Sequence, residues 1–277
     1  MRRETFPVGG PVNLVVHAPA GAVEIEAADV AEATVVLEPQ SDSGQKAVEE
    51  ATVELRGGST RPELLVDIHH GIRFGSRRGP RVSIIVGKGP SVKVSVRVPT
   101  GSSLEVVTDE ADVKGTGVLD RADVKSTAGD VRIDEIEGEA SVKSVSGDVA
   151  LGMVGGEASV NSVSGDATID RVAGPASVHS VSGDIEVREG ASSLHIKTIS
   201  GDARIGSAVE GKVTMQSVSG DLTLGLRAGS KLWVDARSTT GTTTSELALG
   251  DTPPTNGGPL VEFRAKSISG DIRIVRA

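Results

Sequence analysis

The chain has 277 residues, a net charge of −9, 35 glycines and no cysteine. The lack of cysteine excludes disulfides, thiolate catalysis and cysteine-ligated zinc, and the acidic balance argues against nucleic acid as a partner. The hydrophobic residues are mostly aliphatic, with three Phe, one Trp and no Tyr, so we do not expect a core anchored by aromatic rings.

The first hundred residues show alternating β-patterns and no repeat. A helix is expected over 43–51, with Ser43 as its N-cap, and residues 1–103 are predicted to form a β-rich cap that covers a sheet edge. The expected strands are 12–19, 22–27, 33–39, 52–58, 63–70, 81–87 and 92–99.

Two local features of this region allow more than one interpretation. The segment "RFGSRRGPR" is a cationic cluster that fits either a hairpin tip or a contact for an anionic partner; its arginines are Arg73, Arg77, Arg78 and Arg81. His69 and His70 are adjacent on a predicted strand and would face opposite sides, which argues against metal chelation.

The beginning of the chain does not resemble a secretory signal. Its apolar stretch "VNLVV" is short and lies between Pro11 and His17. No stretch reaches the length of a membrane-spanning helix. We therefore expect a cytoplasmic protein.

A repeat begins after this region. The motif "SVSGD" or a close copy recurs, and its glycines stand eighteen residues apart from Gly129 to Gly201, with Gly220 following after nineteen. Residues 104–211 divide into nonads such as "ASVKSVSGD" and "VALGMVGGE". Such a fixed period is the signature of a repeat architecture.

Each nonad predicts one strand and one turn. We expect its first, third and sixth residues to point inward, as in Ala140, Val142 and Val145, with the small Ser144 at a corner. Two nonads then form a coil of about 18 residues, and coils stack about 4.8 Å apart in a parallel ladder. The prediction is an all-β fold with a parallel β-solenoid.

The solenoid is predicted to span 104–277, with a Pro/Gly loop at 248–259 leaving the stack. Trp233 is expected to fill the core. The final segment "SGDIRIVRA" is expected to be a strand at the open end, where Arg273 and Arg276 protect the edge. Formation of a homo-oligomer through this C-terminal edge is one alternative.

The Gly-Asp turns are predicted to be structural. Glycine permits the bend, and the aspartate accepts hydrogen bonds from nearby backbone N–H groups. Calcium binding is the alternative, since the β-roll of secreted toxins binds Ca²⁺ between nonapeptide turns, but "SGD" supplies fewer oxygen ligands. No metal or cofactor is predicted. The turn residues are Gly129, Asp130, Gly147, Asp148, Gly165, Asp166, Gly183, Asp184, Gly201, Asp202, Gly220, Asp221, Gly270 and Asp271.

The fourth position of the same nonads predicts an exposed polar ladder. It fits either a solvated face or a binding surface for an extended anionic polymer or a protein partner. Its members are Lys125, Lys143, Asn161, His179, Lys197 and Gln216. Ser, His and Asp occur together over 177–184, but the repeat itself generates that coincidence. No catalytic residue is predicted, and an enzyme acting on a polysaccharide is the less favoured alternative.

Three stretches resemble a known family: "FPVGGPVNLVVHAPAGAVEIEA", "VSVRVPTGSSLEVVTDEADV" and the run of "SVSGDV"-like turns. Together they are similar to the bacterial putative-adhesin family of unknown function, over nearly the whole chain. The resemblance implies a β-solenoid that acts as a non-enzymatic, adhesin-like interaction scaffold. It supplies no catalytic residues.

Overall fold

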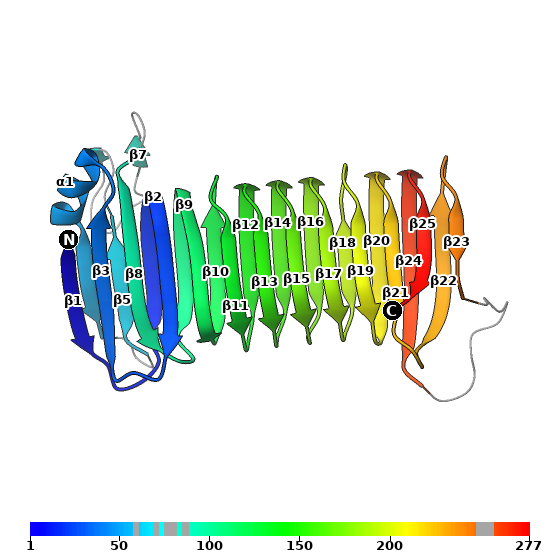
Figure 1. Cartoon of the computed structure of the whole chain (residues 1–277), viewed down its shortest axis with the longest axis horizontal. Helices are drawn as coiled ribbons and strands as arrows, with labels where there is room; N and C mark the ends of the chain where they lie inside the picture. Colours follow the sequence, from blue (N-terminus) through cyan, green and yellow to red (C-terminus); the bar gives the residue numbers. More distant parts are fainter. Residues whose placement is uncertain (58–60, 69–71, 75–81, 85–88, 248–257) are drawn as a thin grey trace. The chain divides into compact units, whose positions relative to one another are not determined.

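The chain is built almost wholly of strands (Figure 1). The computed structural model describes residues 1–57, 61–68, 72–74, 82–84, 89–247 and 258–277. Within these ranges the one helix is α1 (Asp42–Glu50). The residues form two compact units, Met1–Asp130 and Val131–Ala277, so the repeat predicted to begin at residue 104 starts inside the first unit.

The first unit contains short strands and two long ones that each make a full coil. Its strands are β1 (Arg2–Pro7), β2 (Asn13–Ala28), β3 (Glu32–Pro39), β4 (Thr52–Arg56), β5 (Glu63–Asp67), β6 (Ile72–Phe74), β7 (Val82–Ile84), β8 (Ser91–Pro99), β9 (Ser103–Leu119) and β10 (Arg121–Ser126).

The long strand β2 is the centre of this unit. It runs parallel to β9 on one side, and on its other side it pairs with β5 through its first half and with β8 through its second half. The chain bends at Gly21, whose φ is +114°. A Cβ there would collide with the carbonyl oxygen of Val92, so only glycine fits this corner.

Antiparallel strands follow the parallel ladder. β4 pairs with β5, β3 pairs with β8, and β1 pairs with β3. Helix α1 packs against β3 and β8. Its N-cap is Ser41, whose Oγ accepts a hydrogen bond from Gly44 N at 3.0 Å. The prediction of Ser43 as the cap is wrong, because the extended residue before the first turn lies two positions earlier.

Several predicted features lie wholly or partly outside the described residues. Strand β6, which contains Arg73, pairs antiparallel with β7. Most of the loop predicted at 248–259 lies outside the described residues, as do His69, His70, Arg77, Arg78 and Arg81.

The second unit is the solenoid. Its strands are β11 (Val131–Ile136), β12 (Ala140–Ser146), β13 (Val149–Val154), β14 (Ala158–Ser164), β15 (Ala167–Val172), β16 (Ala176–Ser182), β17 (Ile185–Gly190), β18 (Leu194–Lys197), β19 (Ala203–Ala208), β20 (Gly211–Ser219), β21 (Leu222–Leu226), β22 (Lys231–Ser238), β23 (Thr243–Ser245), β24 (Leu260–Ser269) and β25 (Ile272–Arg276).

These strands form two parallel ladders with an aliphatic core. The first sheet contains β12, β14, β16, β18, β20, β24 and β22; the second sheet contains β11, β13, β15, β17, β19, β21, β25 and β23. Val142, Val160 and Val178 stand directly in register and are each 0% exposed. The predicted all-β solenoid fold is therefore confirmed.

The inward position differs between the two nonads of a coil. In the second sheet the sixth residue points inward, as predicted, and Val154 is 0% exposed. In the first sheet the prediction is wrong: Val145 is 49% exposed and Ser144 is buried. Strand β12 runs straight to Ser146, so its alternation puts the fifth residue inside and the sixth outside. The bend comes only at Gly147, where φ is +128°.

The last two coils are stacked out of chain order. Strand β24 lies between β20 and β22, and β25 lies between β21 and β23. The expectation that the final strand stands at the open end is therefore wrong, and so is the basis for self-association through it. Arg273 does not guard an edge, because it bridges Asp221 and Asp271 in neighbouring coils.

Trp233 is not a core residue either. It alternates in β22 with the inward Leu232 and Val234 and pairs in register with Glu262. Its ring lies half-buried beneath the guanidinium of Arg264, 5.5 Å from the ring centroid. This arrangement is a cation–π contact on the outer face.

Candidate binding surfaces

The polar ladder lies on the outer face of the first sheet. Backbone pairing places Lys143, Asn161, His179 and Lys197 side by side in consecutive coils. Gln216 and Lys266 continue the row. Lys125, the other predicted member, is exposed on β10 of the first unit, where it pairs with Val107. Sequence reasoning missed Lys266, because β24 is inserted into the stack out of chain order.

A second column of polar residues runs beside the ladder, two residues earlier on each strand. It is made mostly of hydroxyls, which both donate and accept hydrogen bonds, and it includes one cation, Arg264. Its members are Ser141, Ser159, Ser177, His195, Thr214 and Arg264. The face therefore offers hydroxyl donors next to positive charges over several coils.

His179 lies in the middle of this face and contacts two neighbouring side chains. Its Nε2 lies 3.2 Å from Ser177 Oγ, and its ring meets that of His195 edge-on at 5.4 Å. Burial, followed by the neighbouring His195 and Lys197, lowers the pKa of His179. The ring is therefore neutral at pH 7.

The Ser-His contact is not part of a catalytic triad. The acid suggested by the sequence is Asp184, and its Oδ1 accepts a hydrogen bond from Asp202 N at 2.8 Å. A serine nucleophile needs a histidine that is in turn oriented by a third group. Ser177 and His179 have the geometry of an ordinary outward-facing pair two residues apart on a strand.

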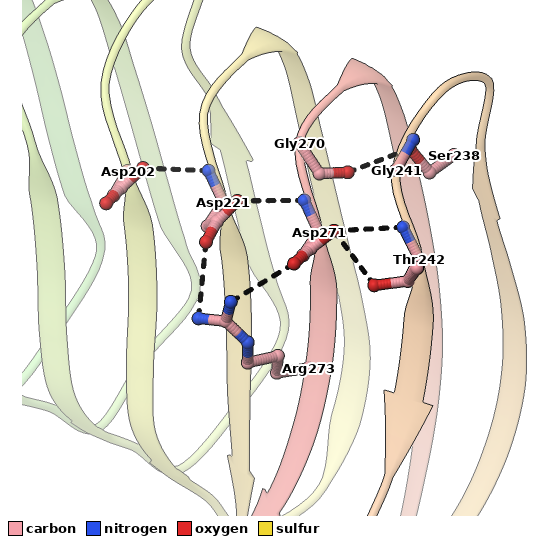
Figure 2. A network of polar contacts seen from close by, with 8 residues as sticks. All are labelled: Asp202, Asp221, Ser238, Gly241, Thr242, Gly270, Asp271 and Arg273. Carbon is pink, nitrogen blue, oxygen red and sulfur yellow. Dashed lines mark hydrogen bonds and ion pairs between the residues drawn. The ribbon is translucent and has the colours of Figure 1, made fainter.

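The aspartates of the turns form a continuous hydrogen-bonded ladder. In each described step, one carboxylate oxygen accepts the backbone N–H of the aspartate in the next coil, as Asp202 does from Asp221 at 2.7 Å and Asp221 from Asp271 at 2.8 Å (Figure 2). The same bond joins Asp148 to Asp166 and Asp166 to Asp184. These amides offset the repulsion between carboxylates stacked one per coil.

The ladder ends at Thr242. Its N–H and its hydroxyl both donate to Asp271 Oδ1 at 2.9 Å. These two bonds, and then Arg273, lower the pKa of Asp271. Across the residues that the structure describes, no group of three or more His, Asp or Glu side chains has a geometry that holds a metal ion. The geometry of the turns is that of a structural ladder, with one oxygen of each bonded carboxylate directed at an amide.

An aliphatic column is the feature that sequence reasoning missed. It consists of the sixth residues of the first sheet, which pack side by side in consecutive coils and are between 43% and 55% exposed. Its members are Val145, Val163, Val181, Ile199, Val218 and Ile268. The Val-Ser-Gly order recurs in these coils, but the pattern predicts an inward sixth residue, and the structure places it outside.

A depression of about 490 Å³ in the first unit is a weaker candidate. Its lining includes Glu24, Glu26 and Arg97. Arg97 pairs with Glu26 at 3.3 Å, and Lys93 pairs with Glu24 at 2.9 Å across neighbouring strands. Both glutamates are therefore paired, and the remaining cations of the lining, Arg3 and Lys114, lack the repeated register of the solenoid face.

The comparisons with known proteins indicate a family but no curated relative. No curated protein matches the chain. Among solved structures, it resembles a putative adhesin from Bacteroides fragilis, with 12% identity, a TM-score of 0.47 and coverage of 99% of this chain and 96% of the other. A putative lipid binding protein from Parabacteroides distasonis matches with 14% identity, a TM-score of 0.48 and coverage of 99% and 96%.

None of the described helical structure has the length and hydropathy needed to span a membrane. The model of the Toastrack DUF4097 family matches residues 13–275, which is nearly the whole chain. The chain is a member of the Toastrack DUF4097 family.

Proposed function

We propose that the protein is a non-enzymatic binding scaffold, adhesin-like in its role, whose ligand is an extended polyanion lying along the polar ladder. The observation that carries this proposal is the uninterrupted register of the ladder. Lys143, Lys197 and Lys266 lie in one row, and the positions between them hold the uncharged Asn161, His179 and Gln216.

The register favours a repeating ligand over a small one. Coils follow each other at about 4.8 Å, so a linear chain of carboxylates or phosphates meets a cation at recurring intervals. Each exposed ion pair contributes only about 0–1 kcal/mol. Useful affinity therefore requires several simultaneous contacts, and we expect it to weaken as salt is added.

A non-enzymatic role is supported by what the outer face contains. Its Ser177 and His179 pair is not oriented by Asp184, since that carboxylate accepts the backbone N–H of Asp202 in the next coil. Asp148, Asp166, Asp202 and Asp221 accept a backbone N–H of the next coil in the same way. A polymer-cleaving enzyme would require an acid and a base placed together in a cleft.

Binding of a labelled polyglutamate and of a labelled polyphosphate, each measured by fluorescence anisotropy in low salt, tests the proposal. The variant Lys143→Glu/Lys197→Glu reverses two charges of the ladder and should weaken binding at least tenfold. The matched control Arg132→Glu/Arg204→Glu makes the same change in charge on the second sheet, where both arginines are exposed.

The control should retain binding within about threefold. The two probes separate a carboxylate ligand from a phosphate ligand. Equal losses in both variants would mean that only net charge matters, and no binding of either probe would contradict the proposed ligand class.

A further inference from the structure

The aliphatic column is an unusual surface for a solenoid face. Six β-branched side chains, each 43–55% exposed, line up in consecutive coils, and at about 4.8 Å per coil the column is about 24 Å long. Scattered exposed aliphatic residues are ordinary on a soluble protein, but a contiguous row indicates a contact surface.

The charges on the two sides of the column have opposite signs. The polar ladder stands two residues before the column on each strand, and three of its members are lysines: Lys143 before Val145, Lys197 before Ile199 and Lys266 before Ile268. The aspartates of the turns stand three residues after it, as Asp166 does after Val163 and Asp184 after Val181. Asp166 and Asp184 are exposed.

We propose that the aliphatic column is the interface of a dimer formed with a second copy of this chain. A two-fold axis parallel to the stacking direction would bring the two columns together with their coils running the same way. It would also place the lysines of each copy opposite the aspartates of the other. The alternative two-fold axis, perpendicular to the stack, would oppose lysine to lysine, so the charges select one arrangement.

Identical repeats strengthen this match. Both copies have the same coil spacing, so a contact between Lys197 and an aspartate of the other copy sets a register in which Lys143, three coils away, and Lys266, two coils away, also meet aspartates. An interface one side-chain column wide is small compared with standard interfaces, which bury about 1,200–2,000 Å². We therefore expect a weak dimer that forms at micromolar or higher concentration.

This dimer rests on the proposed function in one respect, since it uses lysines of the polar ladder. A polyanion and the aspartates of a second copy would compete for them. Self-association is measured without any polymer, whereas polymer binding is measured at protein concentrations below those at which sedimentation detects the dimer. The two proposals therefore fail separately.

Sedimentation velocity of the full chain, from about 1 to about 500 μM, tests the dimer. The variant Val181→Glu places a charge in the middle of the column and should weaken association at least tenfold. Met153→Glu is the matched control, because Met153 is 46% exposed on the second sheet and lies outside the column. It should associate like the unmodified chain.

Val181→Thr, which keeps the β-branched shape, is the second variant and should weaken association less than Val181→Glu. Far-UV circular dichroism and thermal unfolding establish that each variant is folded. Lys143→Glu/Lys197→Glu should also weaken the dimer, and no effect of that pair would overturn the charge-matched arrangement.

A chain that remains monomeric at 500 μM overturns the proposal, as does a dimer that persists in Val181→Glu. Co-sedimentation with phosphatidylglycerol vesicles is run in parallel. Binding of monomeric chain to the vesicles, lost in Val181→Glu, would assign the column to a lipid surface instead of a second copy.

Discussion

The substitution Gly183→Ala tests the structural role of the repeated turn. Gly183 has φ of +128°, a conformation that costs a residue with a side chain about 1–3 kcal/mol. A Cβ at this position would also lie 2.8 Å from the carbonyl carbon of Gly165 and collide with its oxygen. The neighbouring coil must move away, which weakens about one ladder hydrogen bond worth about 1 kcal/mol. We therefore expect a loss of about 3 kcal/mol.

The assay is urea unfolding, monitored by circular dichroism and by the fluorescence of Trp233, the single tryptophan. Gly10→Ala is the control, because an added Cβ there meets nothing within 4 Å and its φ is not positive. It should change the free energy of unfolding by less than about 1 kcal/mol. Equal free energies for Gly183→Ala and Gly10→Ala would refute the assignment of the turn glycine as obligatory.

Three further predictions concern the corner hydroxyls, the aspartate ladder and pH. Ser180→Ala should leave the free energy of unfolding unchanged or raise it, since the buried Oγ has no hydrogen-bond partner among the described residues. Ser238→Ala should instead cost about 1 kcal/mol in urea unfolding, because the Ser238 Oγ donates to the carbonyl of Gly270 and accepts from the N–H of Gly241. Asp184→Ala should destabilise the fold by leaving the Asp202 N–H without its acceptor, while Asp184→Asn, which keeps an acceptor oxygen, should restore most of the loss; equal melting temperatures would contradict this. The pKa of His179 is lowered in the folded state. The contribution of the neutral ring to the free energy of unfolding is therefore complete above the unfolded pKa of about 6.5 and is lost as pH falls below it. The decline in melting temperature from pH 7 to pH 5 should accordingly be smaller in His179→Gln than in the unmodified chain.

The solenoid coil could be predicted from the sequence because the same nine-residue pattern recurs many times along the chain. The period of nine gave the strand and the turn, and the inward Val142, Val160 and Val178 follow from period two within each strand. The error at Val145 arose because one inward pattern was applied to both halves of a coil. The sixth residue is apolar and is therefore expected inside, whereas the residue that is buried is Ser144, of a type usually found on surfaces.

The members of the binding face could be predicted only where chain order and spatial order agree. Lys143, Asn161, His179 and Lys197 follow one another both along the chain and across the sheet. Lys266 does not, since its coil is inserted between two that precede it in the chain. Local patterns identify a strand but not its neighbour, because the linking segment does not fix where the chain re-enters the stack.

The inverted order of the last two coils has a physical reason in their sequences. The coil β24–β25 repeats the motif closely and buries Phe263 completely, whereas β22–β23 is richer in hydroxyls and leaves Leu232 and Val234 only half-buried. Terminal units of repeat proteins are atypical, since one of their faces has no neighbour. The aspartate ladder follows the same logic. A further aspartate at the end coil would present an acceptor with no amide beyond it among the described residues. Thr242 instead supplies two donors to Asp271 and needs none in return, so the ladder ends on a residue that completes the last carboxylate without adding another.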